Sequence, residues 1–214
     1  MSYIISIMPP LLDGFGVTLK VFFATIIFSL PLGLLLALAR ISNFKLLSEA
    51  TGVYIWLLRG TPLMLQLFFF YFALPELGIL LSDFSAALAA FALNYAAYFA
   101  EIFRAGIQAI DRGQYEAAKT LGMTYTQTMR HIILPQVTRH ILPPVSNEII
   151  TLVKDTSLIY VLAMNDLMRI TRSIVQRDFN TLPFFVAAAF YLGMTLLLTW
   201  FFRRLEKHYS VYEN

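Results

Sequence analysis

Long stretches of mostly apolar residues constrain this sequence more than any other feature. A helix needs about 20 residues to cross a hydrocarbon core of about 30 Å. Four windows are long enough and carry little or no charge, and they are 14–39, 52–74, 85–109 and 183–203. A fifth stretch, 136–160, contains Glu148, Lys154 and Asp155, so hydropathy alone does not decide whether it spans the membrane, re-enters it or lies at the interface.

The composition places these stretches in a membrane. Hydrophobic residues make up 58% of the chain and charged residues only 14%, whereas soluble domains are about 25% charged. Much of the surface must therefore face the lipid bilayer. We predict one domain, 1–214, an all-α polytopic membrane protein with five transmembrane helices.

Charge and cysteine content exclude other classes. The net charge of +3 comes without a large basic cluster, which argues against nucleic-acid binding. The chain has no cysteine, so disulfides and thiolate metal sites are excluded. The first positive charge is Lys20, so a basic signal-peptide region is lacking and the first span is expected to be retained.

Lys and Arg in short loops predict the orientation, because they concentrate on the cytoplasmic side. With five spans and an outside N-terminus, ten of these residues lie inside and three outside. The three are Arg169, Arg172 and Arg177, and removing the fifth span leaves the count unchanged. We predict an outside N-terminus and a cytoplasmic C-terminus.

A polar segment, 111–135, interrupts the apolar stretches between the third and fourth predicted spans. Asp111 with Gln114, and Thr124 with Gln127, each have the spacing of a capping box at the start of a helix. The segment is therefore predicted to hold two short cytoplasmic helices.

The two helices are predicted to meet at Gly122, where a positive φ costs little, and to end at Pro135. Tyr115, Ala118 and Leu121 form a short apolar stripe on the first of them. So short a helix gains stability by docking, either on a partner or on the ends of its own spans.

The residues of this segment resemble a known signature. Glu116-Ala117-Ala118, three residues, Gly122, nine residues, Ile132, one residue and Leu134-Pro135 match the EAA motif. That motif is found in the permease subunits of binding-protein-dependent ABC importers, and the five-span layout is similar to their polar amino acid uptake family. The resemblance implies a cytoplasmic coupling segment that docks on the ATPase through Tyr115, Glu116, Ala117, Ala118, Leu121, Gly122 and Met123.

The same resemblance implies the partners and the function. The sequence has no GxxxxGK[ST] loop, so ATP and Mg²⁺ would be bound by a separate ATPase dimer, and this chain is not expected to be an enzyme or to hold a cofactor. A second copy or a homologous permease and an extracytoplasmic solute-binding protein would complete the importer. It would carry a polar amino acid, of the basic or glutamine type, across a bacterial cell membrane by alternating access.

Polar residues inside predicted spans are candidates for the substrate pathway, because they are costly in lipid. Arg59-Gly60-Thr61-Pro62 combines a charge with two helix breakers, and Gln66 follows four residues after the proline. The RGTP sequence also matches the resembling family at this place. An opened backbone here would offer N–H groups to a substrate carboxylate, whereas the alternative is a proline kink with Arg59 reaching the headgroups.

The third predicted span carries a polar stripe of Asn94, Tyr98, Glu101 and Gln108. Residues at this spacing share one helix face, which is expected to face the bundle interior. Glu101 and Arg104 also have the spacing of an ordinary ion pair within one helix. Asn94 and Tyr98, which lie deeper, are the pathway candidates.

The fourth predicted span places Glu148, Thr151 and Asp155 on one face, with Lys154 projecting about 100° away from Asp155. Lys154, Asp155 and Thr156 also match the resembling family's stretch here, which lines its translocation route. Asp155 is a candidate for an ammonium or guanidinium group, and Lys154 or the Arg59 region for a carboxylate. A structural ion pair is the alternative.

Two other functions are compatible with a polytopic chain. Asp155 and Glu148 are suited to carrying protons or Na⁺ in an ion-coupled secondary amino acid transporter, although the sequence shows no inverted repeat. A membrane enzyme is the third possibility. Its support is weak, because His131, His140 and His208 lack ligand spacing.

Overall fold

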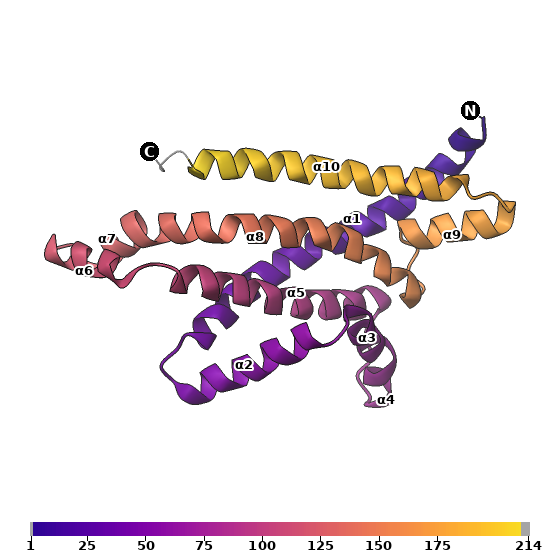
Figure 1. The fold of residues 1–214 in the computed structure, drawn as a ribbon. Helices are drawn as coiled ribbons and strands as arrows, with labels where there is room; N and C mark the ends of the chain where they lie inside the picture. Colours follow the sequence, from indigo (N-terminus) through magenta and orange to yellow (C-terminus); the bar gives the residue numbers. More distant parts are fainter. Residues whose placement is uncertain (1, 211–214) are drawn as a thin grey trace.

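A computed structural model describes residues 2–210, which form helices joined by short connections (Figure 1). The two ends of this described range lie at opposite ends of the bundle, with α6 and α7 near its C-terminal end and α9 near its N-terminal end. The α-helices are α1 (Ser2–Arg40), α2 (Lys45–Gly60), α3 (Leu63–Phe68), α4 (Leu74–Glu76), α5 (Asp83–Gln108), α6 (Arg112–Thr120), α7 (Tyr125–Thr128), α8 (Leu134–Asp155), α9 (Leu167–Asp178) and α10 (Leu182–Ser210). Two π-helical segments, η1 (Phe69–Ala73) and η2 (Met129–Ile133), and the 3₁₀ helix η3 (Thr156–Leu162) join them.

The helices confirm the all-α prediction in the part of the chain that the structure describes, but only part of the span assignment. Within residues 2–210, three helices are long and apolar enough to cross a membrane, namely α1, α5 and α10. The pair formed by α2 and the run Leu63–Glu76 qualifies only as one broken span, bent by 103°. Helix α8 has 22 residues, about 33 Å, but is too polar to qualify by composition. The fifth span remains a prediction.

The first helix extends twelve residues before the predicted span, 14–39. It starts at Ser2 and continues through Pro9 and Pro10, which the sequence suggested would lie before the span. The Tyr3 hydroxyl donates a hydrogen bond of 2.9 Å to the Asp178 carboxylate at the end of α9. This contact fixes the first turn of α1 against the rest of the protein.

Helix α5 forms the centre of the core, and α1 crosses it closely (Figure 1). Phe91, Tyr95 and Phe99 are buried along α5 with neighbouring rings 6.2–6.3 Å apart. At Gly33 of α1, an added Cβ would lie 2.7 Å from the Cβ of Phe99. The glycine therefore allows the backbones of the two helices to approach.

The second helix of the polar segment 111–135 does not end at Pro135, contrary to the prediction. From Tyr125 the chain stays helical through η2 and α8 to Asp155. Pro135 lies in the first turn of α8, where a missing N–H is tolerated because the π-helical turn precedes it. Past Asp155 the helix narrows to η3, so the predicted span 136–160 ends in a 3₁₀ helix.

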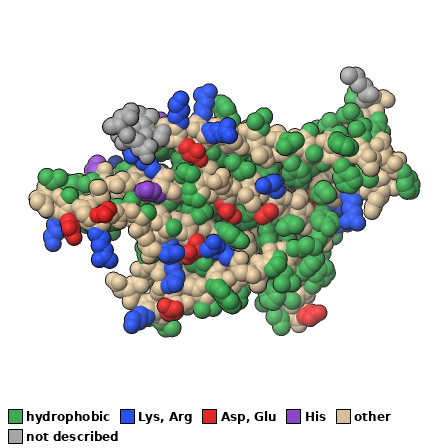
Figure 2. Space-filling model, in the orientation of Figure 1, with side chains coloured by type: hydrophobic (Ala, Val, Ile, Leu, Met, Phe, Trp, Pro, Cys, Tyr) green, Lys and Arg blue, Asp and Glu red, His purple; other side chains and the backbone are tan. Residues whose placement is uncertain are grey.

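Side chains are distributed unevenly over the surface. Figure 2 shows hydrophobic side chains around α3 and α4, where Phe69, Leu77 and Leu80 are exposed. Charged side chains gather along the middle and toward the end that holds α6 and α7. Charge within the apolar bundle therefore marks the region that a functional site would occupy.

Candidate functional site

The helix of the second predicted span is interrupted at the predicted place. Helix α2 ends at Gly60 and α3 begins at Leu63, and the two helices meet at 103°. Thr61 and Pro62 between them have extended backbones, with ψ of 145° and 135°. Proline lacks an N–H and disfavours the helical region for the residue before it, so the RGTP sequence itself produces the break.

Two amide side chains bind the backbone that the break exposes. The Gln66 amide nitrogen donates to the Leu58 carbonyl (2.8 Å), the Thr61 carbonyl (3.1 Å) and the Thr61 hydroxyl (2.8 Å). The Asn94 amide nitrogen donates to the same Leu58 carbonyl (2.9 Å) and to the Gln66 amide oxygen (3.0 Å). These bonds, which we call the amide clasp, join the broken span to α5.

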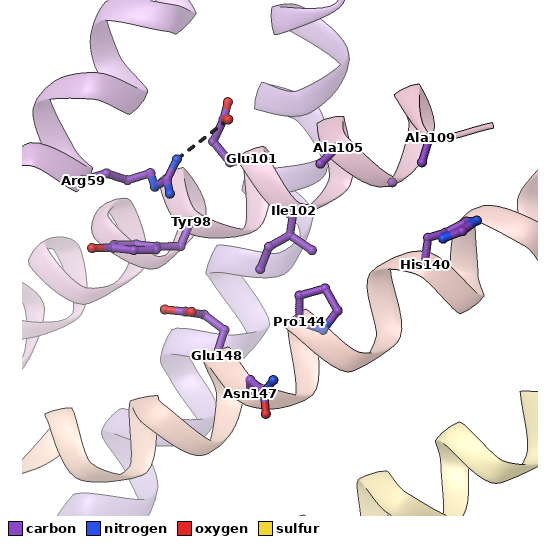
Figure 3. A pocket seen from close by; sticks show the side chains of 11 residues that line it. Arg59, Tyr98, Glu101, Ile102, Ala105, Ala109, His140, Pro144, Asn147 and Glu148 are labelled. Atoms are coloured by element: carbon purple, nitrogen blue, oxygen red, sulfur yellow. Dashed lines mark ion pairs between the residues drawn. The ribbon is translucent and has the colours of Figure 1, made fainter. Parts of the chain in front are cut away.

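A cavity of about 620 Å³ opens beside the break. Most of the predicted pathway residues line this cavity, namely Arg59, Gly60, Thr61, Pro62, Asn94, Tyr98 and Asp155. We call this space the break cavity. A second cavity of about 700 Å³ shares Arg59, Tyr98 and Glu148 with it and extends along α5 and α8 (Figure 3).

Three predicted pathway residues do not line the break cavity. Gln66 serves the amide clasp, so its polar atoms are used by the backbone. Lys154 is exposed, consistent with its projection away from Asp155. Thr156 is fully buried and donates to the Val153 carbonyl at 2.6 Å.

Arg59 is the basic side chain in the wall of both cavities. Its guanidinium lies 5.2 Å from the centre of the Tyr98 ring and 3.7 Å from a Glu101 carboxylate oxygen. Glu101 is bound more tightly by Arg104, through two hydrogen bonds of 2.9 and 2.7 Å. The predicted ion pair within α5 is thus confirmed, and Arg59 is held loosely beside it.

Two carboxylates from α8 face this arginine side of the cavity. Figure 3 shows Glu148 directed toward Tyr98 across the space from Arg59. Asp155 accepts a hydrogen bond of 2.7 Å from the Tyr95 hydroxyl. The cavity therefore offers one cation and two anions to a bound molecule.

Tyr95 is a polar lining residue that the sequence did not indicate. It follows Asn94 directly and is 1% exposed, so it is hard to distinguish from an ordinary core aromatic. The available signal was its hydroxyl, since a buried tyrosine usually finds a hydrogen-bond partner. Glu148 and Thr151, which also line the cavity, lie on the stripe that includes Asp155.

The predicted coupling segment, 111–135, has the turn that Gly122 was predicted to allow. Its φ is +73°, the Gly122 N–H donates to the Lys119 carbonyl, and the Met123 N–H donates to the Ala118 carbonyl. This pair of bonds is the Schellman arrangement at the end of a helix. Thr124 and Gln127 form the predicted capping box, whereas Asp111 caps α6 through the Gly113 N–H without a reciprocal bond from Gln114.

The apolar stripe on α6 is partly buried in the protein and partly exposed at its surface. Ala118 is fully buried and Tyr115 packs on the cluster of Ile110, Ile133 and Val137. Leu121, by contrast, is 78% exposed at the tip. The remaining residues assigned to coupling are exposed or half-buried, namely Glu116, Ala117, Gly122 and Met123.

Comparisons with known proteins agree with these features. Residues 29–211 match the family model described as binding-protein-dependent transport system inner membrane component. The chain is 40% identical to the arginine transport system permease protein ArtQ of Bacillus subtilis over 93% of this chain and 92% of that protein. It is also 40% identical to the probable glutamine ABC transporter permease protein GlnP of Bacillus subtilis, over 91% of each.

A solved structure supports the same assignment. The crystal structure of an amino acid ABC transporter with histidines contains a chain that is 36% identical and superposes with a TM-score of 0.88. The match covers 96% of this chain and 97% of the other. By fold and by sequence, the chain belongs to the binding-protein-dependent transport system inner membrane components, the membrane-spanning permeases of ABC importers.

Proposed function

We propose that this chain carries a polar amino acid into a bacterial cell as the permease subunit of an ATP-driven importer. The observation that carries the proposal is the break cavity, in which Arg59 and Asp155 come from different helices. An amino acid has a carboxylate and an ammonium group, and this wall offers an opposite charge to each. The names of the relatives, which include arginine and glutamine permeases, support the same substrate class.

In this proposal Arg59 binds the substrate carboxylate. The Glu101–Arg104 pair is neutral in itself and is closed by two short hydrogen bonds. Arg59 therefore keeps most of its charge for a ligand, because its contact with Glu101 is longer, at 3.7 Å. Asp155, oriented by Tyr95, receives the ammonium group.

The exposed part of the coupling segment docks on a separate ATPase, which binds ATP and Mg²⁺. Ala117, Leu121 and Gly122 lie on the surface of α6 and its terminal turn. Ala118 acts from the inside, where its small side chain fits the packed face of α6. Closure of two ATPase subunits would move α6 and, through the continuous run from Tyr125, α8 with its two carboxylates.

The complete importer contains two permease chains, either two copies or one with a homologue, and an extracytoplasmic binding protein. We assign five spans to this chain, with α8 as the fourth. The N-terminus lies outside and the C-terminus in the cytoplasm, which puts α6, α7 and the end of α10 on one side of the membrane. Figure 1 shows these three elements at the same end of the bundle, in support of that orientation.

Reconstitution tests the proposal. Proteoliposomes that hold the chain with its ATPase and binding protein should accumulate amino acid only when ATP is supplied. Uptake driven by an ion gradient through this chain alone would refute the ABC mechanism and favour the secondary transporter.

Two matched glycine variants test the coupling segment. Gly122 and Gly78 both have a positive φ and open space around the position of an added Cβ. Gly122→Asp should abolish ATP-driven uptake while leaving membrane insertion intact, because a charged side chain is added at the docking surface. Gly78→Asp, at the other end of the bundle, should insert and transport. Normal uptake by Gly122→Asp would contradict the docking role.

A further inference from the structure

Helix α10 packs on the protein with one face and leaves the opposite face uncovered. The residues that pack on the core are Tyr191, Met194, Leu198, Phe202 and Leu205. The large apolar residues exposed along the helix are Phe185, Leu192, Leu196, Leu197 and Trp200. At about 100° per residue, the two sets lie on opposite sides of α10. Since α10 is long and apolar enough to cross a membrane, its uncovered face is suited to contact with lipid chains.

The uncovered face becomes basic after Trp200. Arg203, Arg204 and Lys207 are exposed within about two turns of Trp200, and all four side chains leave the helix within an arc of about 100°. We call these four residues the α10 patch. Glu206 is half-buried and lies outside this arc. Figure 2 shows Lys and Arg side chains gathered over the C-terminal end of α10. The patch therefore continues the apolar face directly.

The spacing along α10 matches the levels of a bilayer. From Leu182 to Trp200 the helix rises about 27 Å, close to the thickness of about 30 Å of a hydrocarbon core. Tryptophan concentrates at the boundary between hydrocarbon and headgroups. Arg203 and Arg204 follow about 5 Å further along the axis, which is the level of the lipid phosphates.

The two arginines offer their charge to a ligand. The Arg204 guanidinium lies 4.7 Å from the centre of the Trp200 ring, so a cation–π contact holds it beside the boundary. Within residues 2–210, neither Arg203 nor Arg204 forms an ion pair with a carboxylate. A planar guanidinium donates two parallel hydrogen bonds to a phosphate. The patch thus has the chemistry of a phosphate site at the end of an apolar face.

We propose that the α10 patch binds an anionic phospholipid of the cytoplasmic leaflet. Arg203, Arg204 and Lys207 hold the lipid phosphate, and the acyl chains lie along Leu196 and Leu197. Each basic residue near an anionic lipid surface strengthens binding about fivefold. A second copy of this chain fits the patch less well, because it carries a net positive charge. The inference rests on the proposed orientation only for the choice of leaflet.

Quenching of Trp200 fluorescence by brominated lipids tests the proposal. The chain has two tryptophans and Trp56 is exposed on α2, so Trp56→Phe leaves Trp200 as the reporter. The full chain is placed in phosphatidylcholine vesicles with a small fraction of brominated phosphatidylglycerol or brominated phosphatidylcholine, each with bromine on the acyl chains near the headgroup. Quenching at equal fractions gives the relative affinity. We expect phosphatidylglycerol to be preferred at least tenfold.

Three double variants in this background identify the residues. Arg203→Gln with Arg204→Gln should lower the preference at least fivefold, whereas Arg203→Lys with Arg204→Lys should keep most of it, because the charges remain. Arg112→Gln with Arg130→Gln removes two exposed charges elsewhere and should leave the preference unchanged. Equal quenching by the two lipids, or a preference that survives Arg203→Gln with Arg204→Gln, would overturn the inference.

A third result would overturn it as well. If neither brominated lipid quenches Trp200, protein covers this face of α10, as expected for contact with a second permease chain. Transport is not measured in any of these experiments. Failure of the lipid site therefore leaves the proposed function standing.

Discussion

Replacing Gln66 by leucine tests whether the amide clasp stabilises the broken span. Gln66 is 8% exposed, and the two hydrogens of its amide nitrogen are donated to three acceptors around the break, while its amide oxygen accepts from Asn94. Leucine has a similar volume but can donate to none of these acceptors. The Leu58 carbonyl keeps its bond from Asn94, whereas the Thr61 carbonyl loses the hydrogen bond from Gln66.

Two estimates of the cost agree. Side-chain hydrogen bonds between membrane helices contribute about 0.6 kcal/mol each on average, so the two that the amide hydrogens donate and the one that the amide oxygen accepts are together worth about 2 kcal/mol. Leaving one buried carbonyl without a partner costs about 1–3 kcal/mol. For a chain of this size, about 2 kcal/mol lowers the melting temperature by about 4–8 °C.

Thermal unfolding of the purified protein in detergent measures the effect. Gln114→Leu is the matched control, since that side chain is exposed and makes only a 3.3 Å contact with Gln136. A cycle of Gln66→Leu and Asn94→Ala, singly and together, should show coupling of at least about 0.5 kcal/mol, because the two amides are bonded to each other. If Gln66→Leu melts within about 1 °C of the parent, the clasp does not stabilise the break.

Two further predictions concern the packing of α1 and the N-terminal cap of α9. Gly33→Ala should lower the free energy of unfolding by about 1–3 kcal/mol, because the added Cβ would meet Phe99. Gly16→Ala on the same helix should not, since no atom lies within 4 Å of the Cβ that it adds, and equal melting temperatures for the two variants would contradict the prediction. Burial raises the pKa of Asp166, outside the spans, from 3.8 to about 6. The folded chain therefore holds this proton more tightly than the unfolded chain, and the free energy of unfolding should fall by up to about 1.4 kcal/mol per unit as pH rises from about 4 to about 6. In thermal melts between about pH 4 and pH 6, Asp166→Asn should flatten the dependence of stability on pH, while Asp111→Asn, at an exposed helix cap, should leave it unchanged. Parallel profiles of melting temperature against pH for Asp166→Asn and the parent would refute the prediction.

Local signals in the sequence predicted much of the site. The breakers in Arg59-Gly60-Thr61-Pro62 predicted the interrupted span, because a glycine, which disfavours the helix interior, lies two residues before a proline, which lacks a donor and disfavours a helical backbone at Thr61. Gly122 predicted the left-handed turn, and the spacing of Glu101 and Arg104 predicted their ion pair. Each of these depends on residues within one turn or one break.

Features that depend on contacts with a second helix were harder to predict from the sequence. Gln66 was predicted to face the substrate, yet its amide binds Leu58 and Thr61, because the bend of 103° folds the exposed carbonyls back toward it. The partnership of Tyr95 with Asp155 joins residues 60 positions apart, and no periodic pattern within α5 reports it. The sequence likewise did not predict that the helix continues across Pro135, because this continuation depends on the π-helical segment η2 that precedes α8.

Substrate protection of a single cysteine tests most directly whether the break cavity is the transport pathway. The chain has no cysteine of its own, so Thr151→Cys would place one thiol in the cavity wall and Thr120→Cys one on exposed α6 as a control. Saturating L-arginine should slow the reaction of the Thr151→Cys thiol with a water-soluble methanethiosulfonate at least tenfold and leave the Thr120→Cys rate unchanged. A Thr151→Cys rate that is the same with and without amino acid, in a complex that still transports, would contradict the account.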